Sequence, residues 1–155
     1  MTKDGMTNDE ISLPDERDEM AFWGEEGADA VMLLHESPPK RVYDLEERTA
    51  QFGEAAIRFA IKIPRNPVND RLISQLVGAA TSVGANYCEA DDGVSRKDFR
   101  NRIGTCKKEA RETKQFLRMI ATANGPLKPE ARTLWKEARE LHLIFCAIWR
   151  RTIPE

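Results

Sequence analysis

Basic side chains recur along one flank of the segment between residues 96 and 123. At about 100° of rotation per helical residue they share one side of a helix; they are Arg100, Lys107, Arg111, Lys114 and Arg118. A later segment adds Arg132, Lys136 and Arg139. Such a stripe could neutralise nucleic-acid phosphates. The alternative is a solvated helix face with local ion pairs, because Glu137 and Glu140 dilute the second set.

The acidic, imidazole and thiol groups do not form a recognisable catalytic pattern. A carboxylate-bridged metal centre in a helix bundle would use Glu-x-x-His pairs, and the sequence has none. His35 and His142 are far apart, and the apolar neighbours of His142 favour a structural role. No glycine-rich phosphate loop is present. We therefore expect a protein that is not an enzyme, with no catalytic residue, no metal site and no cofactor.

The opposite flank of the 96–123 segment carries Arg102, Glu109 and Phe116 at seven-residue spacing. This mixture of charge and an aromatic ring suits a subunit interface, since a bundle helix with two usable flanks can also contact a neighbouring subunit. The alternative is an ordinary surface with one exposed phenylalanine. We expect a homo-oligomer in which these three residues form the interface.

The elements that must position these residues are helices. Apolar residues recur at three- and four-residue spacings in four segments, which predicts amphipathic helices near 44–63, 71–90, 95–123 and 129–151. Ser95 followed by Asp98 indicates a helix start, and Gly93 is expected to be a left-handed cap. The fold class is all-α, an antiparallel up-down-up-down four-helix bundle with an acidic, partly disordered N-terminal extension.

The charge distribution divides the chain into an extension, 1–43, and a bundle, 44–155. The extension has 11 acidic and 4 basic residues, whereas the bundle has 15 and 20. A weak amphipathic helix is expected between residues 15 and 36, and its Phe22 and Trp23 are candidate partner-binding residues. The extension either touches the bundle loosely, or docks on a protein partner or shields the basic body.

The three cysteines, Cys88, Cys106 and Cys146, are an odd number without close pairs, which favours reduced thiols in a helix core. No signal segment is apparent at the N-terminus. The longest apolar run, Leu143 to Trp149, is too short to span a bilayer. We expect a soluble, cytoplasmic protein without membrane contact.

The stretch from residue 74 to 117 resembles the four-helix-bundle family of bacterial 23S rRNA intervening-sequence proteins, and the resemblance extends over about residues 44–153. The matching features are Gln75-Leu76, Ala80-Thr81-Ser82-Val83, Ala85-Asn86 followed by Glu89, Ser95 with Asp98-Phe99, and Glu112-Thr113 before Leu117. The bundle is also similar to accessory proteins of diversity-generating retroelements. One departure is Val77-Gly78, where many family members have basic residues.

The resemblance implies an up-down-up-down bundle, a ring-shaped homopentamer and a suspected association with nucleic acid. The leading hypothesis is a non-catalytic, oligomeric RNA-associated protein that binds by charge and shape through the basic stripe. The alternative is a protein-interaction scaffold, or an accessory subunit of a mobile-element reverse transcriptase system, that recruits its partner through the extension.

Overall fold

The computed structural model describes residues 16–24 and 45–153, and within these ranges it contains helices and no strand. The chain divides into two units, residues 1–38 and 39–155. The described part of the first unit is helix α1 (Glu16–Trp23), which ends at Gly24 with a φ of 79°. Glycine adopts this left-handed conformation without steric cost, so it ends the helix. The rest of the amphipathic helix expected between residues 15 and 36 lies outside the described residues.

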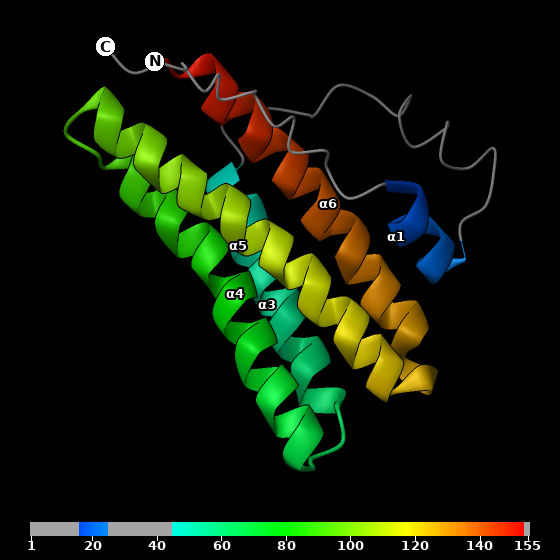
Figure 1. Cartoon of the computed structure of the whole chain (residues 1–155). Coiled ribbons are helices and arrows are strands. Elements are labelled where there is room, and N and C mark those ends of the chain that lie inside the picture. Colours follow the sequence, from blue (N-terminus) through cyan, green and yellow to red (C-terminus); the bar gives the residue numbers. More distant parts are fainter. Residues whose placement is uncertain (1–15, 25–44, 154–155) are drawn as a thin grey trace, which may run out of the picture. The chain divides into compact units, whose positions relative to one another are not determined.

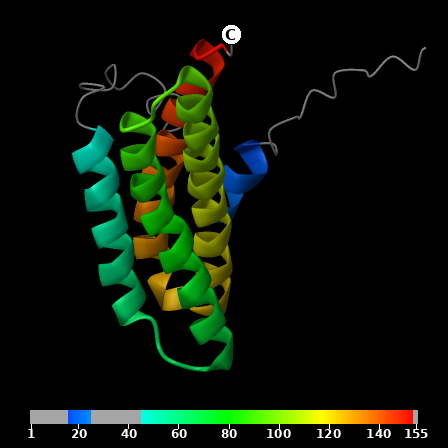
Figure 2. The same cartoon turned by 90° about the vertical axis from the view of Figure 1, so that its left-hand side faces the viewer.

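The second unit is a bundle of four long helices. Figures 1 and 2 show them side by side, with consecutive helices running in opposite directions. Helix α4 packs on α5, α5 packs on α6, and α3 contacts both α4 and α6. The helices are α3 (Leu45–Lys62), α4 (Pro67–Asp91), α5 (Arg96–Ala123) and α6 (Lys128–Arg151), with the short 3-10 helix η2 (Gly125–Leu127) before α6. The antiparallel four-helix bundle predicted from the apolar pattern is confirmed.

The core consists of the apolar side chains whose spacing predicted the helices. Each helix contributes one buried stripe, because side chains three and four residues apart share one face. Fully buried members include Leu76 and Val83 of α4, Ile103 and Leu117 of α5, and Leu141 and Phe145 of α6. Burying each such side chain stabilises the fold by about 1.5 to 3 kcal/mol. Burial of these four stripes is therefore the main contribution that orients the helices.

Two helix starts are fixed by side-chain caps. The Ser95 hydroxyl accepts the Asp98 backbone N–H at 3.1 Å, which confirms the predicted start of α5. Helix α4 begins earlier than the apolar pattern indicates. The Asn66 side chain accepts the Asn69 N–H at 2.8 Å, and Pro67 occupies the first helical turn. Proline is favoured there, because that position needs no backbone hydrogen bond.

The expectation that Gly93 is a left-handed cap is wrong. Among the described glycines only Gly24 has a positive φ, and Asp92 caps α4 with φ −85°. The Gly93 N–H instead donates to the Ala90 carbonyl at 3.1 Å. A Cβ at Gly93 would lie 3.0 Å from that carbonyl oxygen. The residue is therefore small because the turn is tight, rather than because its backbone is left-handed.

A pair of buried asparagines joins the start of α4 to the end of α5. The Asn69 side-chain Nδ2 donates to the Asn124 side-chain Oδ1 at 2.9 Å, and Asn124 Nδ2 donates back to Asn69 Oδ1 at 2.9 Å. Asn69 also donates to the Pro64 carbonyl at 2.7 Å, and Asn124 donates to the Ile120 carbonyl at 3.0 Å. Both side-chain amides thus find partners although they are buried, which is the condition for a buried polar pair to be tolerated.

Candidate nucleic-acid interface

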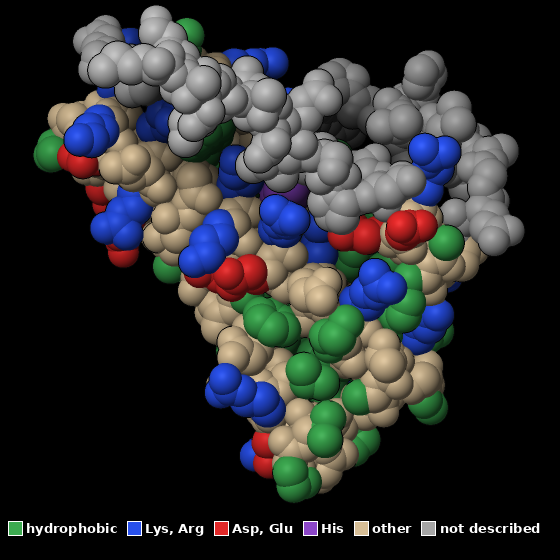
Figure 3. Space-filling model, viewed as in Figure 1, with side chains coloured by type: hydrophobic (Ala, Val, Ile, Leu, Met, Phe, Trp, Pro, Cys, Tyr) green, Lys and Arg blue, Asp and Glu red, His purple; other side chains and the backbone are tan. Residues whose placement is uncertain are grey.

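Basic residues are concentrated on two of the four bundle helices. Helix α5 contains nine basic and three acidic residues, and α6 contains six and three. In contrast, α3 and α4 together contain four basic and six acidic residues. Figure 3 shows lysine and arginine side chains gathered over the upper part of the visible face. The positive charge of the bundle therefore belongs to α5 and α6 rather than being spread evenly.

The three acidic residues of α6 face α3 and are neutralised there. Arg48 Nε donates to Glu137 at 2.7 Å, and Arg48 also pairs with Glu140. Lys62 Nζ lies 3.1 Å from Glu130. The hydrogen bond that Arg48 donates to Glu137 raises the pKa of the Arg48 guanidinium. The sequence suggested that Glu137 and Glu140 would offset the basic residues of α6. In the structure both carboxylates face α3 instead and pair with Arg48.

Two residues of the predicted stripe hold an indole ring between α5 and α6. The Arg100 guanidinium carbon lies 3.6 Å from the centroid of the Trp149 ring, and Lys107 Nζ lies 4.2 Å from it. A Cβ at Gly104 would be 3.3 Å from the indole nitrogen, so the ring lies against this glycine between the two cations. Cations over an indole face are attracted by its quadrupole. This contact locks the far end of α6 onto α5.

Of the remaining stripe residues, Lys114 lies in the same seam between α5 and α6. Lys114 is only 9% exposed, and its Nζ lies 5.7 Å from the Trp135 ring. Arg111 is exposed, and the other four, Arg118, Arg132, Lys136 and Arg139, are half-buried. The predicted nucleic-acid residues therefore lie on two helices that pack together. The sequence analysis missed the two tryptophans in the seam, Trp135 and Trp149. The available signal was Gly104, a small residue between Arg100 and Lys107 that leaves room for a ring.

His142 lies in this seam as a buried, neutral side chain. It is 6% exposed, and its Nε2 lies 3.5 Å from Cys146 Sγ. Burial lowers its pKa to about 4, and the nearby charges of Lys114, Arg111, Lys107 and Arg150 act in the same direction. Burial therefore keeps the imidazole neutral, with a smaller contribution from the nearby cations, which agrees with the structural role expected from the sequence.

The residues predicted for a subunit interface lie on the α5 flank nearer α4. Arg102 is bound to α4 of its own chain, with Glu89 at 2.6 Å and the Asn86 side-chain oxygen at 3.3 Å. Glu109 is half-buried, and burial together with Glu112 raises its pKa. Phe116 is also half-buried. Figure 3 shows hydrophobic side chains gathered over the lower half of the visible face of the molecule.

The cysteines divide into two buried thiols and one exposed thiol. Cys106 and Cys146 are buried, as expected, and burial raises the pKa of Cys106 to about 12. Cys88 is exposed, so its assignment to the apolar core is wrong. Its position on α4 lies at the edge of the apolar stripe, where a small rotation of the helix decides burial. Burial and the carboxylates of Glu46 and Asp92 raise the pKa of the Cys88 thiol.

Within residues 16–24 and 45–153, no three His, Cys, Asp or Glu side chains come together as a metal site. No helix in these ranges is long and apolar enough to cross a membrane.

The candidate partner-binding residues Phe22 and Trp23 lie at the end of α1, with ring centroids 4.9 Å apart at an interplanar angle of 89°. Edge-to-face packing of this kind makes the two rings one aromatic unit.

The fold and seam define an all-α, antiparallel four-helix bundle with a cationic seam between its last two helices. The family of 23S rRNA-intervening sequence proteins matches residues 43–146, and the chain belongs to this family. This confirms the resemblance seen in the sequence.

A solved structure shares the same fold. It is a protein of unknown function from the S23 ribosomal protein family of Bacteroides thetaiotaomicron VPI-5482, with a TM-score of 0.60 and 22% sequence identity. The match covers 68% of this chain and 97% of that chain. Among proteins with curated functions, none matches the chain significantly.

Proposed function

We propose that the protein is a non-catalytic RNA-associated protein that binds phosphates along the seam between α5 and α6. The observation that carries this proposal is the charge segregation, with fifteen basic residues on α5 and α6 against four on α3 and α4. Because the α6 carboxylates pair with Arg48 and Lys62 of α3, they do not oppose the field at the seam.

The seam favours recognition by charge and shape. Its cations are held by two packed helices, so their spacing is fixed before a ligand arrives. Arg100 and Lys107 are further restrained by Trp149, which reduces the entropy lost when a phosphate binds. Phosphate contacts give affinity and position but carry no direct sequence information. We therefore propose a structured RNA as the ligand, without base-specific readout.

Binding of a fluorescent RNA hairpin across a salt series tests this function. We expect Arg111→Ala/Arg118→Ala to weaken binding and to reduce the slope of log affinity against log salt by about two, since each lost phosphate contact removes about one released counterion. The matched control is Arg58→Ala/Arg71→Ala, which removes the same charge from exposed sites on α3 and α4. Equal losses in both double variants would locate binding outside the seam.

We also propose that the protein is a homo-oligomer, a pentamer by family resemblance, with Arg102, Glu109 and Phe116 in the interface. Phe116 supports this, because its half-buried ring leaves apolar surface accessible on the α5 flank that also carries Arg102. Sedimentation should give a mass that is a multiple of the 17.6 kDa chain. Phe116→Asp should lower this mass, and Gln115→Asp on the exposed neighbouring position should not.

A second candidate is a protein-interaction scaffold, or an accessory subunit of a mobile-element reverse transcriptase, that recruits its partner through α1. The half-buried ring of Phe22, packed edge-to-face on the buried Trp23, favours it, because an accessible aromatic ring supplies apolar contact area. The test is nuclease-resistant capture of one defined protein that is lost in Phe22→Ala/Trp23→Ala. Capture that depends only on RNA would favour the seam instead.

A further inference from the structure

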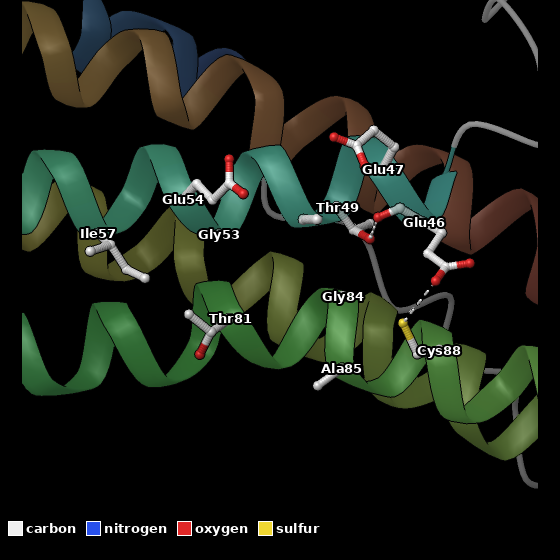
Figure 4. A pocket seen from close by; sticks show the side chains of 11 residues that line it. Glu46, Glu47, Thr49, Gly53, Glu54, Ile57, Thr81, Gly84, Ala85 and Cys88 are labelled. Atoms are coloured by element: carbon white, nitrogen blue, oxygen red, sulfur yellow. Dashed lines mark hydrogen bonds between the residues drawn. The ribbon is translucent and has the colours of Figure 1, made fainter.

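A groove of about 440 Å³ runs along the outer surface between α3 and α4, away from the basic seam. Figure 4 shows its two walls, with Glu46 of α3 reaching toward Cys88 of α4 and Ile57 near the opposite end. The floor and walls are built mainly from small side chains. These are Thr49, Ala50 and Gly53 of α3, and Thr81, Gly84 and Ala85 of α4.

The groove is shallow because α3 and α4 approach closely along it. A Cβ at Gly84 would lie 3.1 Å from the Thr49 hydroxyl, and a Cβ at Gly53 would lie 3.7 Å from the Thr81 backbone. Small side chains on the outer positions leave the backbone of both helices accessible from outside. A third helix could therefore approach the line of contact between α3 and α4 closely, with the long side chains of the lining at its edges.

Three carboxylates and no basic residue line the groove. Among the described residues, the Glu47 carboxylate accepts only from the Gln51 side chain at 3.2 Å, and the Glu46 carboxylate accepts only from the Cys88 thiol at 3.9 Å. The Glu54 carboxylate makes no hydrogen bond or ion pair with another described residue. The carboxylates of α6, in contrast, are all paired with cations of α3. The groove therefore keeps a negative field that its own bundle does not neutralise.

The same edge of α3 exposes large apolar side chains. Ile57 is 41% exposed at the end of the groove, and Ile61 is 78% exposed one turn further on. These residues are four apart, so they share one helix face with Ala50 and Glu54. A partner that covers this face can bury the two isoleucines, while its charged groups stay at the rim beside Glu47 and Glu54.

We propose that the groove between α3 and α4 binds a cationic amphipathic helix of another protein. The apolar, small-residue face of that helix lies over Ala50, Ala85 and Ile57. Its lysine or arginine side chains contact the groove carboxylates. Charge complementarity selects this occupant, because an acidic or neutral helix would leave three carboxylates beside apolar surface without a counter-charge.

The geometry also sets the spacing of the occupant's charges. Glu47 and Glu54 are seven residues apart, which is about 10.5 Å along α3 at 1.5 Å per residue. Two basic residues seven apart on the bound helix match this distance. The groove extends from Glu46 to Ile57, which corresponds to about three helical turns. The occupant is thus a segment of at least three turns, with a small apolar stripe between two basic residues.

Fluorescence anisotropy with the full-length protein tests this site. The probe is a fluorescein-labelled helical peptide of about four turns, with alanine and leucine on one face and lysines seven residues apart on the flank. We expect saturable binding that weakens with salt. A peptide of the same design with glutamates in place of lysines should bind at least tenfold more weakly, because it would place like charges beside the groove.

Two variants locate the binding. Ala85→Trp fills the groove from an exposed position of α4 and should weaken peptide binding at least tenfold, whereas Ala123→Trp at the exposed end of α5 should leave it unchanged. Glu47→Gln/Glu54→Gln should weaken it about fivefold, as expected for two exposed ion pairs. The control with the same charge change, Asp91→Asn/Asp92→Asn, should have no effect. All variants keep the acidic extension, so any attraction of the peptide to it is common to them.

Three results would overturn the proposal. One is binding of the lysine peptide to Ala85→Trp at wild-type strength. Another is no saturable binding by the wild-type chain. The third is a lower native mass of Ala85→Trp in the absence of peptide, which would assign the groove to a second copy of this chain. Circular dichroism melts confirm that the compared variants are folded. If Ala85→Trp does not fold, Glu47→Gln/Glu54→Gln still tests the site.

Discussion

The two halves of the bundle use different means to bring neighbouring helices together. Helices α3 and α4 meet through small residues, with Gly84 against Thr49, and their outer surface carries unneutralised carboxylates. Helices α5 and α6 meet through long cations and indole rings, as in the contact of Arg100 and Lys107 with Trp149. One pair therefore leaves an acidic groove and the other a filled, positive seam. The difference shows how one compact fold can offer two surfaces of opposite charge.

The close contact of α3 with α4 gives the largest expected effect. Gly84→Leu should destabilise the fold by about 2 to 3 kcal/mol, because a side chain there must displace Thr49 or push the helices apart. Gly78→Ala is the matched control. A Cβ at Gly78 meets nothing within 4 Å, so this change should add about 0.5 to 1 kcal/mol of stability through helix propensity. Urea denaturation measures the unfolding free energy of both variants. A similar loss of stability in Gly84→Leu and Gly78→Ala would contradict a close helix contact at Gly84.

Burial of His142, helped by the positive charges of the seam, should make stability depend on pH. Its folded pKa of about 4 lies below the ordinary value of 6.5, so the unfolded chain binds more protons between these pH values. Stability is therefore complete above pH 6.5 and falls as the pH drops toward 4. Between pH 6.5 and 5 the loss should be about 2 kcal/mol.

His142→Gln removes the titrating group but retains a polar side chain of similar length. Its unfolding free energy should change less between pH 6.5 and 5 than that of the wild-type protein. Thermal and urea melts at matched ionic strength give the comparison. If the two pH profiles are parallel, the acid sensitivity comes from other groups, and burial in the seam does not lower the pKa of this imidazole.

The indole contact of the seam gives a smaller effect. Trp149→Leu retains an apolar side chain but removes the ring that Arg100 and Lys107 contact, and it should cost about 1 to 2 kcal/mol. Leu143→Ala, at an exposed α6 position, should cost less than about 0.5 kcal/mol. An equal loss of stability in the two variants would mean that Trp149 contributes only ordinary apolar packing. The contrast between the two halves of the bundle would then be weaker.

The sequence predicted what depends on neighbours along the chain. The apolar spacing located all four bundle helices, and the Ser95 cap was recognised because its partner, Asp98, is three residues away. Gly93 was assigned a left-handed backbone because glycine permits it, but the turn uses its lack of a Cβ instead. Residue type alone does not distinguish these two reasons for a glycine.

The candidate site was less predictable, because it depends on how each helix rotates about its axis. The stripe on α5 could be read from spacing. The pairing of Arg48 with Glu137 joins residues 89 apart, and the Trp149 contact crosses between two helices. The groove was missed entirely, since its walls are small residues of two helices whose exposure follows only from packing.

The reciprocal asparagine pair has a consequence for how the chain assembles. Apolar stripes on α4 and α5 repeat along both helices, so a shift by two turns would again place apolar residues against apolar residues. Such a shift would separate Asn69 from Asn124 and leave two buried amides without the partners they now have. The pair therefore selects one axial alignment among several that the hydrophobic pattern permits. It thereby fixes the position of the α5 basic flank along the molecule.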